Sequence, residues 1–344
     1  MKPKVGVVGC GRNSIYVHLP VWKALSSRVE LVGIYDINQE KCKRVAQSFN
    51  IMSFKDYQDL LESNIDIVGI CTPTSTHFPL AKEAISKGKH VLTEKPLLTS
   101  QEGRELIELA KLEQVKFGVV QHYIYSKAMD AIRATISKGI LGKPLHYEIS
   151  YPIGRLNLTE WAARKECGGF LWEFGCHPSY IIASLMGKPE RIIGMGRLPT
   201  IRQVCNFTIF LEKGEDSASI RLCPDCSQAY MLDVNGPNAR LRGDLLSDTV
   251  TMNRNWFSSS SLYKRVANVR LNTTWHSMRS ALAASKKALR YALIGPKSLN
   301  QFRLFEAFVK QVSGESNSFL SDGETAVTAV EILESACKGA LDQC

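Results

Sequence analysis

Residues 4–14 read KVGVVGCGRNS, a short apolar run followed by a glycine-rich turn. The run Val5–Val8 predicts a buried strand, and Gly9, Gly11 and Ser14 form a GxGxxS pattern at its end. Gly9 permits the tight turn, and Gly11 lets backbone N–H groups approach a diphosphate at a helix N-terminus. Ser14 is still small enough for close packing. The stretch therefore predicts a dinucleotide-binding Rossmann domain.

An acidic residue stands where such a domain binds the adenosine ribose. Asp36 closes the second apolar run, Leu31–Tyr35, about 20 residues beyond the glycine motif. Its carboxylate would accept hydrogen bonds from the ribose hydroxyls and repel the extra phosphate of NADP, which predicts NAD as the cofactor. The alternative is that Asp36 only starts the turn into the helix at Gln39.

The alternation of strand and helix patterns continues to Val120, which predicts a doubly wound parallel sheet. Further strands are expected at Ile65–Cys71, His90–Thr93 and Lys116–Val120. The intervening helices are expected at Pro20–Leu25, Gln39–Phe49, Tyr57–Ser63, Pro79–Lys87 and Ser100–Glu113.

After Gln121 the pattern changes to consecutive extended runs, which predicts an α+β domain with an open, mainly antiparallel sheet. A helix is expected at Ala128–Ser137, and helices at Phe302–Val312 and Glu324–Leu341 end the chain. The extended runs are His146–Tyr151, Arg191–Gly196, Val204–Leu211, Ala218–Leu222 and Ala229–Val234. We expect an NAD-binding domain at 1–122 and a substrate and oligomerisation domain at 123–344, with a basic helical insertion at about 254–303.

Composition fits a two-domain globular chain in a reducing cytoplasm. The chain has 344 residues, of which 44% are hydrophobic and 22% charged, and no apolar run approaches a membrane-spanning length. Its ten cysteines show no disulfide framework. Cys223 and Cys226 have the spacing of a redox or zinc site, but no second ligand pair accompanies them. Two free thiols and no metal are the favoured interpretation.

The net charge of +10 lies in one segment, because no acidic residue occurs between Asp248 and Glu306. Within it, Trp275, Met278, Leu282, Leu289 and Leu293 recur at helical spacing, with Arg279, Lys286, Lys287 and Arg290 elsewhere around the helix. A surface helix covering the sheet is one interpretation, and a wall for a phosphorylated or nucleotide-linked sugar is another. Membrane contact is less favoured since the run is not strongly hydrophobic, and nucleic acid is not expected.

Three further motifs resemble one enzyme family. They are ICTPTSTH at 70–77, GKHV and EKP at 88–96, and GGFLWEFGCH at 168–177. In order and spacing they resemble the Gfo/Idh/MocA oxidoreductases (glucose-fructose oxidoreductase, inositol dehydrogenase, rhizopine catabolism). The likeness extends over the chain outside about 235–300. It implies a Rossmann domain followed by an open-sheet domain whose exposed face mediates a homodimer or homotetramer.

The resemblance also implies site residues. Lys95 matches the lysine that touches substrate and cofactor, and His177 matches the acid/base histidine, with Glu173 as the third catalytic residue. The chemistry agrees, because hydride transfer from a carbinol needs a proton acceptor, and a charged lysine can stabilise the developing alkoxide. The expected cofactor contacts are Gly9, Gly11, Arg12, Asn13, Asp36, Thr72, Pro73, Thr74, His77, Glu94, Lys95 and Gln121. The expected substrate contacts are Lys95, Tyr123, Trp161, Glu173, His177 and Tyr180.

Three places depart from the family pattern, one of which is His122-Tyr123, where the family frequently has Asn-Arg. Glu173 and Tyr180 stand where the family commonly has aspartates, which puts the partnership of Glu173 with His177 in question. The leading hypothesis is an NAD-dependent dehydrogenase or reductase acting on a CH–OH group of a sugar or polyol, nucleotide-activated sugars being the favoured class. The alternative is a non-catalytic, dinucleotide-sensing regulator on the same fold.

Overall fold

The computed structural model describes residues 2–152, 168–196, 206–223, 230–254, 278, 282–283, 285–316 and 319–341. The chain forms two compact units. The first contains Met1–His122, Leu158–Tyr180 and Ile294–Leu333, and the second contains Tyr123–Asn157, Ile181–Leu293 and Glu334–Cys344. Where the sequence predicts a single boundary at 122/123, the two units instead alternate along the chain beyond that point.

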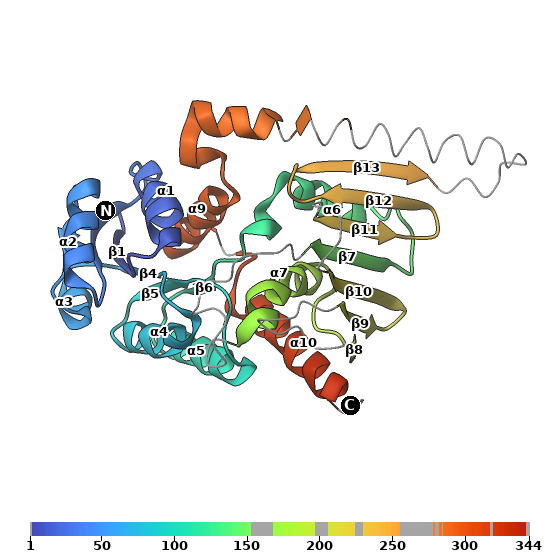
Figure 1. Cartoon of the computed structure of the whole chain (residues 1–344), viewed down its shortest axis with the longest axis horizontal. Coiled ribbons are helices and arrows are strands. Elements are labelled where there is room, and N and C mark those ends of the chain that lie inside the picture. Colours follow the sequence, from blue (N-terminus) through green and yellow to red (C-terminus); the bar gives the residue numbers. More distant parts are fainter. Residues whose placement is uncertain are drawn as a thin grey trace, which may run out of the picture. The chain divides into compact units, whose positions relative to one another are not determined.

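The first unit is built on a six-stranded sheet of order β3-β2-β1-β4-β5-β6, all of whose pairs are parallel (Figure 1). This is the predicted doubly wound sheet, and only the two-residue β3 has no counterpart in the sequence prediction. The strands are β1 (Lys4–Val8), β2 (Glu30–Tyr35), β3 (Met52–Ser53), β4 (Ile67–Ile70), β5 (His90–Thr93) and β6 (Phe117–Val119).

Helices cover this sheet with two apolar layers. One core cluster includes Leu60, Ile85, Leu106 and Val330, from four different helices. Elsewhere in the unit the buried ring of Trp22 packs 4.6 Å from that of Phe305. The helices are α1 (Leu19–Ala24), α2 (Gln39–Phe49), α3 (Tyr57–Glu62), α4 (His77–Ser86), α5 (Ser100–Leu112), α9 (Asn300–Val312) and α10 (Gly323–Leu341).

Helix α7 (Gly169–Met186) carries the third motif and was not predicted. It contains Gly175 and Pro178, which disfavour a helix in isolation, and apolar residues occur all round it. A helix that is apolar on all sides has no amphipathic pattern in its sequence. Helix α7 could therefore not be predicted from periodicity.

The second unit is built on a seven-stranded sheet of order β13-β12-β11-β7-β10-β9-β8, in which only β7 and β10 pair in parallel. The prediction of a mainly antiparallel sheet is thus confirmed, with α6 (Lys127–Ser137) packed against β12 and β13. The strands are β7 (His146–Pro152), β8 (Arg191–Gly196), β9 (Phe207–Lys213), β10 (Asp216–Cys223), β11 (Met231–Asn235), β12 (Ala239–Asp244) and β13 (Thr249–Arg254).

Strands β12 and β13 were not predicted from the sequence. Their arginines hide the alternation, although Arg240 and Arg242 in fact flank Asp233 of β11 and bond to both of its carboxylate oxygens. In the basic segment, residues 278, 282–283 and 285–294 are helical as predicted, whereas Trp275 and Arg279 lie outside the described residues. Cys226, further back in the chain, also lies outside them. No helix in the described ranges is long and apolar enough to cross a membrane.

Candidate cofactor and catalytic site

The two glycines of the turn after β1 are required for different reasons. Gly9 has φ +103°, and a Cβ there would lie 2.3 Å from the carbonyl oxygen of Cys71, so no other residue fits. A Cβ on Gly11 would meet nothing nearer than that same oxygen at 4.0 Å. The space above Gly11 is therefore open, and helical residues begin at Arg12 directly after it. This is the cradle that a diphosphate requires.

Asp36 braces the same turn from the end of β2. Its Oδ2 accepts a hydrogen bond from the backbone N–H of Cys10 over 2.6 Å, and its Oδ1 accepts one from Asn38 over 2.8 Å. The side chain is partly exposed. A carboxylate offers about four acceptor directions, so two remain for the hydroxyls of a ribose. The residues present thus fit NAD.

Glu94 joins the glycine turn to the end of β5. Its buried Oε1 accepts hydrogen bonds from Asn13 Nδ2 over 2.6 Å and from His18 Nε2 over 2.7 Å, while Oε2 accepts one from the N–H of Lys95 over 3.2 Å. Asn13 and Glu94, both predicted to contact the cofactor, are therefore partners of each other. Their contact fixes the turn relative to the loop that carries Lys95.

His18 was not singled out from the sequence, and it is completely buried. Burial opposes its charge, but Cys71 and Glu94 outweigh burial and raise the pKa of His18 to about 10. Hydrogen bonds from His18 lower the pKa of Glu94 against its own burial. The two form a buried ion pair. The only signal in the sequence is a histidine one helical turn beyond the glycine motif.

The same three side chains form a set that could hold a metal ion, since ligand atoms of His18, Cys71 and Glu94 lie within 4.8 Å of one another. As they stand, His18 and Glu94 bond to each other directly. The sequence expectation of no metal stays a prediction.

The loop after β4 contains Thr72, Pro73 and Thr74, which lead through a short 3-10 turn (Thr74–Thr76) into α4. His77, at the start of α4, is 2% exposed, and its two ring nitrogens lie 3.0 Å from the Pro96 carbonyl and 2.9 Å from the Thr72 carbonyl. His77 thus bridges the two loops that were predicted to face the cofactor. Each ring nitrogen faces a backbone carbonyl of one of these loops.

Lys95 follows β5 and its ammonium group is held by α7. Nζ donates to Glu173 Oε1 over 2.6 Å, with side chains 14% and 23% exposed. Burial opposes the charge of Lys95, but Cys176, Glu173 and Glu94 outweigh burial and raise its pKa. Burial raises the pKa of Cys176 itself to about 12, so this thiol is neutral and the carboxylates hold the lysine charged.

His177 lies one turn beyond Glu173 on α7, and its surroundings favour the neutral form, whereas those of Lys95 favour the charged form. Burial, helped by the charges of Lys95 and His122, holds its pKa well below 6.5. Its Nδ1 lies 3.1 Å from the hydroxyl of Tyr180, which is 1% exposed. Tyr180, predicted as a substrate contact, thus orients the imidazole. The first unit brings together a charged lysine and a neutral histidine.

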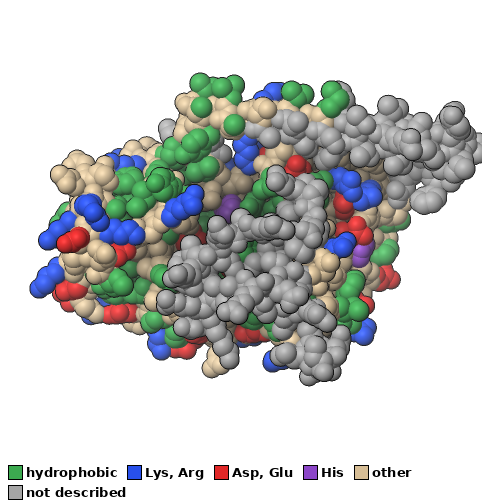
Figure 2. All heavy atoms as spheres, in the orientation of Figure 1, with side chains coloured by type: hydrophobic (Ala, Val, Ile, Leu, Met, Phe, Trp, Pro, Cys, Tyr) green, Lys and Arg blue, Asp and Glu red, His purple; other side chains and the backbone are tan. Residues whose placement is uncertain are grey.

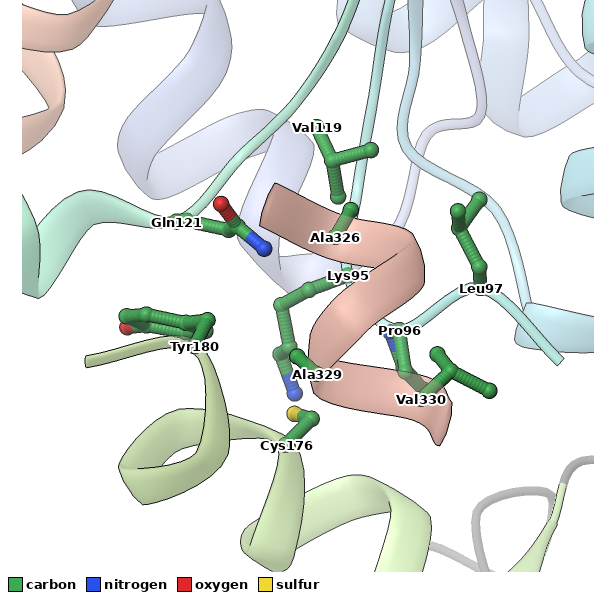
Figure 3. Close-up of a pocket in the computed structure, with 10 residues that line it drawn as sticks. All are labelled: Lys95, Pro96, Leu97, Val119, Gln121, Cys176, Tyr180, Ala326, Ala329 and Val330. Carbon is green, nitrogen blue, oxygen red and sulfur yellow. The ribbon is translucent and has the colours of Figure 1, made fainter. Parts of the chain in front are cut away.

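A pocket lies beside these residues (Figure 3). Figure 3 shows the Lys95 amino group directed toward Cys176 of α7, with Gln121 and Tyr180 alongside. Gln121 is 2% exposed, and among the described residues its Oε1 finds no hydrogen-bond partner, which suits a site completed by a ligand. The lining residues are Lys95, Pro96, Leu97, Val119, Gln121, Cys176, Tyr180, Ala326, Ala329 and Val330.

Three predicted contacts remain, those of Arg12, Tyr123 and Trp161. Arg12 is exposed at the start of the first helical turn. Tyr123 belongs to the second unit, where its ring packs edge-on 4.9 Å from that of Tyr230. Trp161 lies outside the described residues. A contact missed from the sequence is that of Trp172, whose Nε1 donates to the Leu98 carbonyl over 2.8 Å and ties α7 to the Lys95 loop.

Comparison with known proteins identifies the family. Residues 3–121 match the model of the NAD-binding Rossmann domain of the GFO/IDH/MocA oxidoreductases, and residues 129–225 match the model of the C-terminal domain. The chain belongs to this family. The expected fold and the expected NAD cofactor are thereby confirmed.

Individual relatives are more distant. The chain is 28% identical over 205 residues, 58% of its length, to a dTDP-3,4-didehydro-2,6-dideoxy-alpha-D-glucose 3-reductase of Streptomyces violaceoruber. It is 37% identical over 109 residues, 31% of its length, to the UDP-N-acetylglucosamine 3-dehydrogenase of Acidithiobacillus ferrooxidans. The matches span 60% and 33% of those two proteins, under two thirds of either.

A solved structure shows the same fold over the whole chain. The WlbA dehydrogenase of Bordetella pertussis, in complex with NADH and UDP-GlcNAcA, aligns with a TM-score of 0.80 at 18% identity. The alignment covers 100% of this chain and 96% of that one.

Proposed function

We propose that this oxidoreductase moves a hydride between NAD and a carbinol carbon of a nucleotide-activated sugar, and that the carbon is C3. The names of both sequence relatives specify position 3 of a nucleotide-linked hexose, and the WlbA structure holds a nucleotide sugar. The observation that carries the proposal is the division of charge between Lys95 and His177. A lysine held charged and a histidine held neutral are the two groups that alcohol oxidation requires.

Each residue has a separate task in this proposal. Bound NAD would accept the hydride from the carbinol carbon during oxidation and return it during reduction. His177 accepts the hydroxyl proton during oxidation and donates it back during reduction. Lys95 donates a hydrogen bond to the same oxygen and stabilises its negative charge, while Glu173 aims the ammonium group and Tyr180 aims the imidazole.

The alternative of a non-catalytic, dinucleotide-sensing regulator draws on the departures at Glu173 and Tyr180. Both residues have partners among the proposed catalytic groups, since Glu173 bonds to Lys95 and Tyr180 contacts His177. The departures therefore give the regulator little support.

The proposal is tested with the full chain, NAD and a panel of UDP- and dTDP-hexoses, following NADH absorbance. A substrate deuterated at C3 should transfer its label to the nicotinamide and slow the reaction. Free hexoses, which lack the nucleotide, test whether it is needed for recognition, and they should react poorly. Label retained at C3 during turnover would contradict the position, and tight NADH binding without turnover of any sugar would favour the regulator.

A further inference from the structure

The helix at 285–294 presents its apolar side to solvent. Four large apolar side chains of the segment are exposed by 54% (Met278), 61% (Leu282), 60% (Leu289) and 73% (Leu293). In the continuous helix at 285–294, Leu289 and Leu293 lie one turn apart, within an arc of about 40°. We call this pair the leucine stripe. Single exposed leucines are ordinary, whereas two in line beside exposed cations indicate a contact surface.

One residue on the opposite side of this helix contacts its own unit. Lys287 donates a hydrogen bond to the Leu246 carbonyl over 3.1 Å, and Ala283, one turn before it, is only partly exposed. Lys287 projects about 140° from the middle of the leucine stripe. The stripe therefore points away from the residues that hold the helix, and no described residue buries it.

Cations flank the stripe without acidic residues to balance them. Lys286 and Arg290 are exposed and lie next to the stripe on one side. The sequence contains no Asp or Glu from 249 to 305. Figure 2 shows hydrophobic and basic side chains side by side along the upper edge, where Figure 1 draws this helix.

We infer that this helix docks the protein on an anionic lipid bilayer, with the leucine stripe among the acyl chains and the cations at the headgroups. An interfacial helix combines an apolar stripe with flanking lysines and arginines whose heads reach lipid phosphates. From the sequence, phosphate recognition was favoured because the run is not strongly hydrophobic. The structure changes that balance, since the apolar residues are not used to cover the sheet.

The positive charge of the helix favours an anionic bilayer over the other possible occupants of this surface. A second copy of this helix would bring like charges together, and a nucleic acid backbone offers nothing to the leucine stripe. Anionic lipid satisfies both features at once, because attraction by the surface adds to burial of the stripe.

The first test mixes the full chain with vesicles and measures co-sedimentation. We expect binding to vesicles of equal parts phosphatidylcholine and phosphatidylglycerol, little binding to phosphatidylcholine alone, and weaker binding as salt is raised. No binding to the anionic vesicles would overturn the inference.

Matched variants test which residues are responsible. Leu289→Gln with Leu293→Gln should weaken binding about tenfold or more, whereas Leu112→Gln, an equally exposed leucine of the first unit at 75%, should not. Lys286→Gln with Arg290→Gln should weaken it about 25-fold, at about fivefold per charge. Lys43→Gln with Lys55→Gln, two exposed lysines of the first unit, is the charge control.

Two further results would assign the surface to another occupant. Sedimentation velocity showing a dimer that the leucine pair abolishes, without vesicle binding, would assign it to a second copy. A raised KM for a nucleotide sugar in the Lys286 and Arg290 variant, again without vesicle binding, would assign the cations to the substrate. The substituted positions are exposed, so melting temperatures should match that of the wild type.

Discussion

The ammonium group of Lys95 lies 2.6 Å from Oε1 of Glu173, although the two residues belong to motifs 78 positions apart. The family pattern has a shorter aspartate at position 173, and the longer side chain reaches the lysine directly. Glu173 therefore holds the ammonium group of Lys95, and Tyr180 contacts His177. The departure from the family pattern at position 173 thus gives Lys95 a charged partner.

We predict that Glu173→Gln lowers kcat by about 10- to 100-fold, because the ammonium group loses the charged acceptor that aims it. Lys95→Ala should cost about 10²–10⁴, and the double variant should be no worse than Lys95→Ala since both act through one ammonium group. Glu173→Asp keeps the charge and should fall between wild type and Glu173→Gln. Steady-state kinetics at saturating NAD measure this. A normal kcat in Glu173→Gln would show that the contact between Glu173 and Lys95 does not contribute to catalysis.

We predict that His177→Ala lowers turnover by about 10²–10⁴ while NADH binding is kept. Because the pKa of His177 lies well below 6.5, the ring is neutral throughout the neutral range. The rate of sugar oxidation should therefore stay level as the pH falls to 6.5 and decline only in more acidic solution. Tyr180→Phe keeps the edge-on contact of the two rings but loses the hydroxyl, and should lower turnover about tenfold.

The exposed His146 provides the matched control, since His146→Ala removes an imidazole 41% exposed in the second unit. Its kinetics should match those of the wild type. An acidic limb starting at or above pH 6.5 would contradict the low pKa of His177, and normal turnover in His177→Ala would exclude it as the proton acceptor.

The sequence predicts the first unit well because each buried strand and each amphipathic helix leaves a local pattern. The glycine turn and Asp36 could be predicted as a dinucleotide-binding motif because they too form a local pattern, at the ends of two buried strands. Helix α7 could not, since it is apolar all round and contains Pro178. Strand β12 was missed because its arginines are balanced by Asp233 on the neighbouring strand, a contact that only pairing reveals.

The partners within the site were equally beyond the sequence. The motifs name Lys95, Glu94 and His177, but not which side chains they contact. His18 becomes visible only when the first helix places it against Glu94, 76 positions away.

We predict that the His18–Glu94 pair is a main stabilising contact of the first unit. His18→Leu leaves the buried carboxylate of Glu94 without its charged hydrogen-bond donor and should cost about 3–5 kcal/mol in the free energy of unfolding. The pKa of His18 is raised from 6.5 to about 10, so its contribution is full below pH 6.5 and is lost as the pH rises through about 10.

Urea denaturation of wild type and His18→Gln between pH 6 and about 10 measures this pair, since the glutamine keeps a donor without the charge. The difference in unfolding free energy should shrink as the pH rises. A difference that is constant with pH would show that His18 is not charged in the fold.

We predict that Asp36→Ala weakens NAD binding by about 1–3 kcal/mol and narrows the gap between NAD and NADP, because two ribose hydroxyls lose their acceptor. Fluorescence titration with NADH and NADPH measures both affinities. Asp36→Asn keeps an acceptor oxygen and should fall between. Unchanged NADH affinity in Asp36→Ala would exclude the ribose role.

The last prediction separates the two glycines of the turn. In Gly9→Ala the methyl group would lie 2.3 Å from the Cys71 carbonyl oxygen at φ +103°, so β1 and β4 must shift and the melting temperature should fall by several degrees. In Gly11→Ala the methyl group enters open space, with 4.0 Å to that oxygen, and the melting temperature should stay unchanged. The NADH affinity of Gly11→Ala should nevertheless fall at least about tenfold, because the methyl group occupies the path of the diphosphate. Thermal melts without cofactor and NADH titrations of both variants make the comparison, with Gly139→Ala, also at positive φ but with nothing within 4 Å, as the control for strain alone. Full NADH affinity in a stable Gly11→Ala variant would mean that the diphosphate does not lie over this turn.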